Sequence, residues 1–305
     1  MQKGFLPSDQ PLLILDEIHK YKDWRNLVKG LFDRHRRKIQ FLITGSARLD
    51  YYRHGGDSLQ GRYHYLRLHP LSLCELDSFH DADLDQLLQF GGFPEPFLEG
   101  EVSFWRRWQQ ERKTRVIHED LISLERVQEV AKINLLVDHL PHKIGSPLSI
   151  QSMMGDLSAA HKSISKWLDI LQNLYFIFRI APYCPPSIRA VKKEQKLYLW
   201  DWSLCLDEGA KFENLVASNL LKYCHYRQDT EGHLMELRYL RDTDKREVDF
   251  VVLKDGKPLF AVECKVKAKN LSPHIKYFAE RTDIPIFFRY IEEWMTSKWP
   301  PSDHD

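Results

Sequence analysis

Residues Pro11–Lys20 read PLLILDEIHK, an apolar run that ends in two adjacent carboxylates, Asp16 and Glu17. The run Leu12–Leu15 is continuously apolar, which is the pattern of a parallel strand covered on both faces. Carboxylates at the end of such a strand can hold Mg²⁺ and orient an attacking water, and phosphoryl-transfer sites use both roles. The stretch therefore predicts a parallel α/β sheet with an acidic site at its edge.

The residues that follow complete a strand-helix-strand unit. Lys22–Arg37 places apolar residues at helical spacing, and Phe41–Thr44 is a second apolar run. This order predicts parallel pairing of the two strands through a right-handed crossover. Thr44 and Ser46 would then lie at the same sheet edge as Asp16, where they could contact a γ-phosphate or the attacking water.

An arginine in the next segment could complete this site. Arg62 lies in SLQGRYHYLRLHPLS and could bring a positive charge to a transferring phosphoryl group. Tyr63–Leu68 within the same segment predicts a further strand. A plainer interpretation stays open, in which Asp16 caps the following helix and Arg62 is a surface residue. The phosphate-binding motif G-x-x-x-x-G-K-[ST] does not occur in the 305 residues.

Several ordered segments resemble one known family. LLILDEIHK, FLITGSA and LQGRYHYLRLHPLSLCEL resemble the Walker B, sensor and arginine segments of prokaryotic AAA+ ATPases whose C-terminal half is a nuclease-related domain of unknown function. FGGFPEPFL, FENLVASNLL and REVDFVV match in the same order. The resemblance implies ATP and Mg²⁺ as ligands. It also implies that Asp16 binds the metal, Glu17 orients the attacking water and Arg62 is a trans-acting arginine finger. The family's P-loop is missing, so we expect a truncated or internally initiated member with impaired nucleotide binding.

The middle of the chain predicts helices. Leu76–Val130 is rich in charge and reads as a helical lid or linker, interrupted by a loop at Gly91–Gly100. Ala131–Pro182 has the order helix, turn, helix, strand, which is the layout of a winged helix-turn-helix. Its presumed recognition helix, starting at Ser158, carries few basic residues, so a module that only packs domains together is an open alternative. The polar stretch that ends at Lys196 marks a domain boundary.

The remaining residues predict an α/β domain with acidic side chains on successive elements. Glu213 lies on a predicted helix, Asp249 on a strand, and Glu263 and Lys265 on the next strand. Because side chains alternate along a strand, Glu263 and Lys265 share one face. A carboxylate for Mg²⁺ beside an ammonium for the water or the phosphate is a suitable pair for hydrolysis.

The position of Asp249 depends on the hairpin that joins the two strands. A two-residue turn at Asp255-Gly256 would pair Asp249 with Val262, on the wrong face. A three-residue loop at Lys254–Gly256 would pair Asp249 with Ala261. Asp249 would then lie diagonal to Glu263, on the same face of the sheet. A hydrolytic site therefore predicts the three-residue loop.

The order of these acidic residues resembles the PD-(D/E)xK nuclease superfamily. The resemblance implies Asp249 and Glu263 as metal ligands, Lys265 in catalysis and Glu213 as a further acidic contributor at the metal. A salt-bridged cluster in a domain that binds nucleic acid without cutting is the open alternative. The chain could thus be a metal-dependent nuclease that needs no ATP, or a nonenzymatic DNA-binding or toxin–antitoxin-like interaction protein.

Bulk composition narrows the class of protein. The net charge is +1, so no global field points to nucleic acid or membrane, and no apolar run is long enough to span a bilayer. Five scattered cysteines are typical of a reducing compartment, which predicts a cytoplasmic protein. The strand edge left by the missing P-loop strand predicts self-association.

Together these features predict an α/β protein in four parts. The parts are a partial AAA+ parallel sheet at residues 1–75, a helical lid or linker at 76–130, a winged-helix-like module at 131–196, and a restriction-endonuclease-like α/β domain at 197–305.

Overall fold

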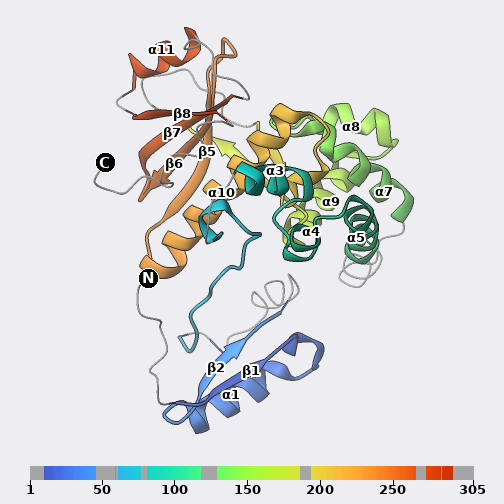
Figure 1. Cartoon of the computed structure of the whole chain (residues 1–305), viewed down its shortest axis with the longest axis vertical. Helices are drawn as coiled ribbons and strands as arrows, with labels where there is room; N and C mark the ends of the chain where they lie inside the picture. The colour runs from blue at the N-terminus through green and yellow to red at the C-terminus, as the bar shows by residue number, and fades with distance from the viewer. Residues whose placement is uncertain are drawn as a thin grey trace. The chain divides into compact units, whose positions relative to one another are not determined.

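A computed structural model of the chain is drawn in Figure 1. It describes residues 10–45, 59, 61–76, 81–117, 129–185, 194–265, 273–282 and 284–290. The chain forms two compact units, Met1–Tyr65 and Leu66–Asp305.

The first unit contains the predicted strand-helix-strand arrangement. Strand β1 (Leu12–Leu15) pairs in parallel with β2 (Gln40–Ile43), and helix α1 (Trp24–His35) connects them. Helix α1 buries Trp24 and Val28. The prediction of a parallel β-α-β unit is confirmed.

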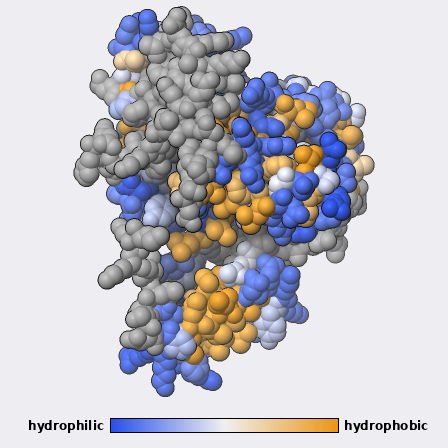
Figure 2. Space-filling model, viewed as in Figure 1, coloured by the Kyte–Doolittle hydropathy of each residue, from blue (hydrophilic) through white to orange (hydrophobic). Residues whose placement is uncertain are grey.

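Apolar side chains are exposed on this small sheet. Leu12 and Ile14 on β1 and Leu42 on β2 are each more than 40% exposed. Figure 2 shows apolar residues gathered over these strands. Because Ile14 pairs with Leu42, the exposed side chains form one continuous surface.

The second unit begins with helices. They are α3 (Asp81–Phe90), α4 (Pro94–Glu99) and α5 (Val102–Thr114). The predicted loop at Gly91–Gly100 is wrong in part, because α4 lies inside it. The proline at the first position of α4 has no N–H to leave unpaired, and Gly100 ends the helix in a left-handed conformation.

A second group of helices follows at α7 (Val130–His139), α8 (Ile150–Leu157) and α9 (His161–Asn173). Ser149 caps α8, since its side chain accepts a hydrogen bond from the Ser152 amide. The prediction that a helix begins at Ser158 is wrong, because this residue ends α8 in a left-handed conformation. Short 3₁₀ helices lie at Ile18–Lys20, Leu73–Glu75, Leu140–Lys143 and Trp202–Leu204.

A six-stranded mixed sheet in the order β4-β3-β5-β6-β7-β8 forms the rest of the second unit. Strand β3 runs antiparallel to β4 and parallel to β5, and β8 runs parallel to β7. Since β4 begins at Lys196, the sheet continues through the residue at which a boundary was predicted. The strands are β3 (Ile177–Pro182), β4 (Lys196–Leu199), β5 (Met235–Arg241), β6 (Glu247–Lys254), β7 (Lys257–Lys265) and β8 (Ile286–Tyr290).

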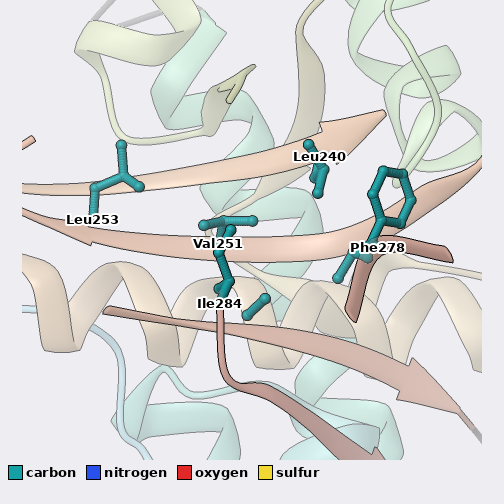
Figure 3. Packing of buried hydrophobic residues seen from close by; sticks show 7 residues of the cluster. Leu240, Val251, Leu253, Phe278 and Ile284 are labelled. Carbon is teal, nitrogen blue, oxygen red and sulfur yellow. The ribbon is translucent and has the colours of Figure 1, made fainter. Parts of the chain in front are cut away.

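Helices pack against this sheet, and among them α9 contacts β3. Helix α10 (Glu208–Glu231) contacts β4, β5, β6 and β7, and α11 (Pro273–Ala279) contacts β6. Figure 3 shows Val251 and Leu240 of the sheet gathered with Phe278 of α11 in a buried apolar cluster. This core holds the strands that carry the acidic residues.

The predicted strand at Tyr63–Leu68 is wrong, because all six residues are described and none is in a strand. In its second half, the Arg67 amide donates to the Asp229 carboxylate at 3.0 Å, and the Arg67 guanidinium donates to the same carboxylate. The backbone thus bonds to a side chain of α10 instead of to a neighbouring strand.

Candidate functional site

The first candidate site lies at the carboxyl edge of β1 and β2. The Thr44 hydroxyl donates a hydrogen bond to Asp16 Oδ1, and the Thr44 amide donates to the Leu15 carbonyl at 3.0 Å. Parallel strands bring their carboxyl ends to one edge, which is why residues 28 positions apart meet. The predicted neighbours Asp16 and Thr44 are therefore in contact.

Glu17 directly follows Asp16 and has an unusual backbone conformation. Its φ of 49° is left-handed, which is uncommon for a residue with a side chain. Its carboxylate lies 3.3 Å from Lys20 Nζ and 3.7 Å from His19 Nε2. His19 is buried, and its ring nitrogens have no hydrogen-bond partner among the residues described. Sequence reasoning missed His19, whose only signal was its position two residues after Glu17.

Arg62 and Ser46 complete the predicted set. Arg62 Nε donates to Asp33 Oδ1 of α1 at 3.1 Å, within the same unit. This pairing places Arg62 against the crossover helix of the β-α-β unit. Ser46 lies outside the described residues.

The second candidate site is built around the hairpin of β6 and β7. The predicted three-residue loop is wrong: the turn has two residues, Asp255 and Gly256, with φ of 52° and 77°. Both angles are left-handed, which is the geometry of a two-residue turn that matches the twist of the strands. Such a turn alone would place Asp249 opposite Val262.

A register shift within the strands changes that pairing. Next to the turn, Lys254 pairs with Lys257. A register shift between Val252 and Leu253 then moves the pairing of the residues farther from the turn by one position. Phe250 consequently pairs with Val262, so the next position along the ladder brings Asp249 opposite Glu263. A β-bulge adds one residue to one strand and so turns the following side chains to the other face. The two carboxylates share a face, as predicted, but for a different structural reason.

Both carboxylates of the hairpin are held by neighbouring groups. The Cys264 amide donates to Asp249 Oδ2 at 2.8 Å, and Lys265 Nζ donates to Glu263 Oε1 at 2.5 Å. Glu263 is only 5% exposed. The predicted pairing of Glu263 with Lys265 on one face is present.

Glu213 of α10 is held by residues of β4. The Tyr198 hydroxyl donates to Glu213 Oε1 at 2.7 Å, and Lys196 Nζ lies 3.4 Å from the same oxygen. Lys196 also lies 2.5 Å from Glu247 Oε1. Sequence reasoning missed Lys196, Tyr198 and Glu247. The available signal was Glu247 two residues before Asp249, which places both side chains on one face of β6.

Burial and mutual repulsion change the ionisation of this cluster. Burial raises the pKa of Asp249 well above its ordinary value, and the charges of Glu213 and Glu263 raise it further. Burial likewise raises the pKa of the Cys264 thiol. Burial alone would lower the pKa of Lys265, but its hydrogen bond to Glu263 and the negative charges of Glu263 and Asp249 together raise it. Lys265 is thus charged at neutral pH.

The hairpin carboxylates fit a divalent cation better than Glu213 does. Glu263 Oε2 is buried and has no hydrogen-bond partner among the described residues. Mg²⁺ is usually held by one or two carboxylates with water completing its shell, so Asp249 and Glu263 could hold it. Glu213 Oε1 is already engaged by Lys196 and Tyr198. Within the described ranges, no group of three or more His, Cys, Asp or Glu residues is placed to hold a metal ion.

Comparisons with family models divide the chain in three. Residues 1–77 match an AAA domain, residues 81–208 match a Domain of unknown function (DUF8612), and residues 208–291 match a Domain of unknown function (DUF4143). These matches support an AAA-type ATPase family with a C-terminal domain of unknown function.

Similar proteins come from archaea and bacteria. An uncharacterized protein of Methanocaldococcus jannaschii is 22% identical over 87% of this chain and 64% of its own length. An uncharacterized protein of Mycobacterium tuberculosis is 24% identical over 72% of this chain and 54% of its own. One of Haemophilus influenzae is 23% identical over 84% and 66%. The chain thus spans about 54–66% of the length of these relatives.

No solved structure matches this chain. Among the described residues, every helix is too short or too polar to cross a lipid bilayer.

Proposed function

We propose that this chain is an AAA-type nucleotide-binding protein with a nuclease-like C-terminal domain that acts on or binds nucleic acid. The observation that carries the first part is the hydrogen bond between Thr44 and Asp16 at the carboxyl edge of a parallel sheet. Ligands of α/β proteins bind at this edge. Asp16 would hold the Mg²⁺ of a nucleotide, and Glu17 would orient water. Arg62 would act on a nucleotide of a neighbouring subunit.

Nucleotide binding by these 305 residues alone is expected to be weak. Backbone amides and a lysine of a P-loop usually hold the phosphates, and that motif is not among these residues. Thr44, and Ser46 beyond the described residues, would contact only the terminal phosphate. The acidic pair contributes metal binding, which cannot replace the phosphate contacts.

Isothermal titration with Mg²⁺ and a nonhydrolysable ATP analogue tests this proposal. Asp16→Asn should abolish whatever binding the chain shows, because the amide lacks the charge that Mg²⁺ requires. Asp23→Asn is the matched control, since Asp23 is exposed and lies before α1. Binding that is equal in both variants, or absent from the unaltered chain, would contradict nucleotide binding at this edge.

The second part of the proposal is carried by the shared face of Asp249 and Glu263 beside Lys265. A divalent cation at the two carboxylates would supply Lewis acidity and a nucleophilic water. Lys265 would then contact the phosphate of the nucleic acid or the attacking water.

Incubation of the chain with labelled DNA and RNA in Mg²⁺ tests cleavage. Glu263→Gln and Lys265→Met should each reduce cleavage by about 100-fold or more, whereas Glu236→Gln on β5 should not. Cleavage that survives both changes would reject the nuclease hypothesis. Retained nucleic-acid binding without cleavage in every variant would favour a binding module.

A further inference from the structure

Lys196 is a buried cation that the proposed function does not use. Its side chain is 1% exposed, although lysine is seldom buried fully unless it is paired. Its ammonium lies 2.5 Å from Glu247 Oε1 and 3.4 Å from Glu213 Oε1, and 5.4 Å from the centre of the Tyr239 ring. The residue therefore lies inside the acidic cluster.

The cluster is organised around this ammonium. Burial alone would lower the pKa of Lys196, but the combined attraction of Glu213, Asp249 and Glu247 outweighs burial and raises that pKa above its ordinary value. Lys196 is thus a permanent positive charge near three carboxylates. A second cation, Arg241, also pairs with Glu247, and its Nη1 lies 2.8 Å from Glu247 Oε2.

The fold also keeps Glu213 in contact with Lys196. A side chain at Gly145 would place its Cβ 2.8 Å from Glu213 Oε2, so glycine leaves room for the carboxylate. Tyr198 fixes the other oxygen from β4, the strand that carries Lys196. Gly145 therefore leaves room for Glu213, and Tyr198 fixes its carboxylate beside the lysine.

We propose that Lys196 is the resident cation of this cluster and competes with a divalent metal ion for it. The inference rests on the proposed nuclease-like domain, in which Asp249 and Glu263 remain for an external cation. The ammonium repels a second cation, because two positive charges interact strongly in a buried environment. It also neutralises Glu213 and Glu247, which would otherwise add to metal affinity.

A titration with Mn²⁺ tests this competition without measuring catalysis. Electron paramagnetic resonance detects the free ion during the titration. All variants are made in the full chain with Asp16→Asn, which removes the carboxylate proposed to hold Mg²⁺ at the other candidate site. Lys196→Met should tighten Mn²⁺ binding by about tenfold or more. Lys257→Met is the matched control, since Lys257 is an exposed lysine on β7 and should change nothing.

The removal of a buried cation can unfold the domain, so a second variant accompanies the first. This double variant, Lys196→Met with Glu247→Gln, loses one positive and one negative charge. It should still bind Mn²⁺ more tightly than the parent chain with Asp16→Asn alone. Adding Glu263→Gln should abolish the gain, which assigns it to this cluster. Unchanged, weaker or undetectable Mn²⁺ binding in the folded variant would overturn the proposal. A gain in affinity without any nucleic-acid cleavage or binding would leave it standing and reject the nuclease-like function.

Discussion

Gly145 shows how a single residue positions an acidic side chain. Its φ is +70°, and an added Cβ would lie 2.8–3.0 Å from the carboxylate of Glu213. The residue is glycine for two reasons, the left-handed backbone and the close approach of the carboxylate. Neither reason could be seen in the sequence, where Gly145 and Glu213 are far apart.

Gly145→Ala should therefore destabilise the second unit by about 2 kcal/mol or more, from backbone strain and displacement of Glu213. Gly155→Ala is the matched control, because Gly155 lies in α8 with nothing within 4 Å of its added Cβ. The control should gain about 0.5–1 kcal/mol from helix propensity. Urea denaturation measures both, and equal effects would contradict the assignment.

Asp249 should make stability depend on pH. Its pKa is raised in the folded chain, so the folded state holds a proton that the unfolded state releases above about pH 4. Stability from this residue is therefore lost as pH rises from the ordinary aspartate range toward the raised pKa.

Asp249→Asn should stabilise the chain more at pH 8 than at pH 5, because the amide never ionises. Its side-chain oxygen can still accept from the Cys264 amide. Urea denaturation at the two pH values measures this difference. A gain in stability that is the same at both pH values would show that ionisation of Asp249 does not destabilise the folded chain.

At the scale of elements, α10 carries a residue of the acidic cluster and also contacts Arg67 and His69 of the same unit. Glu213 lies near its start, and its later turns bind Arg67 through Asp229 and His69 through His225. The ring nitrogens of the two histidines are 2.8 Å apart. A hydrogen bond between two imidazoles needs one neutral ring nitrogen as acceptor, so this contact cannot survive protonation of both.

This contact should make the docking of the segment on α10 sensitive to acid. Burial, followed by repulsion from neighbouring cations, lowers the pKa of His69 to about 2 and that of His225 to about 4. The unfolded chain takes up protons below about pH 6.5, so stability should fall between pH 6.5 and 4. His225→Gln should flatten this fall in thermal melts taken across that range. An unchanged pH profile would contradict the assignment.

On the scale of the whole molecule, the division into two units implies separate folding. The second unit, Leu66–Asp305, contains its own sheet, helices and core. Expressed alone, this fragment should unfold cooperatively with the same midpoint as the corresponding transition in the full chain. Differential scanning calorimetry measures this, and a fragment without a cooperative transition would reject independent folding.

We predict that the chain self-associates through the exposed apolar face of β1 and β2. Ile14 is 55% exposed and Leu42 is 45% exposed on that face. Ile14→Thr should raise the monomer fraction in light scattering because it reduces the apolar surface available for association. Leu98→Thr is a control in the second unit, where Leu98 is 75% exposed. Equal monomer fractions in both variants would count against association through this sheet.

The sequence alone determined the local elements. The continuous apolar run of β1 and the helical spacing of α1 predicted a parallel β-α-β unit, and alternation predicted that Glu263 and Lys265 share a face. These predictions succeeded because each depends on a periodicity within a few residues. The extended Tyr63–Leu68 pattern failed, and at Arg67 the backbone amide bonds to Asp229 of α10 instead of to a neighbouring strand.

Only the tertiary structure decided which charges meet. The register shift between Val252 and Leu253 brings Asp249 to Glu263, and no local signal marked it. Lys196 looked like the end of a polar linker, yet it begins a buried strand and pairs with Glu213 and Glu247. A buried charge is stable only beside its partners, and those partners come from other strands and a helix. The sequence predicts the residue types of such a site, whereas long-range packing determines their neighbours.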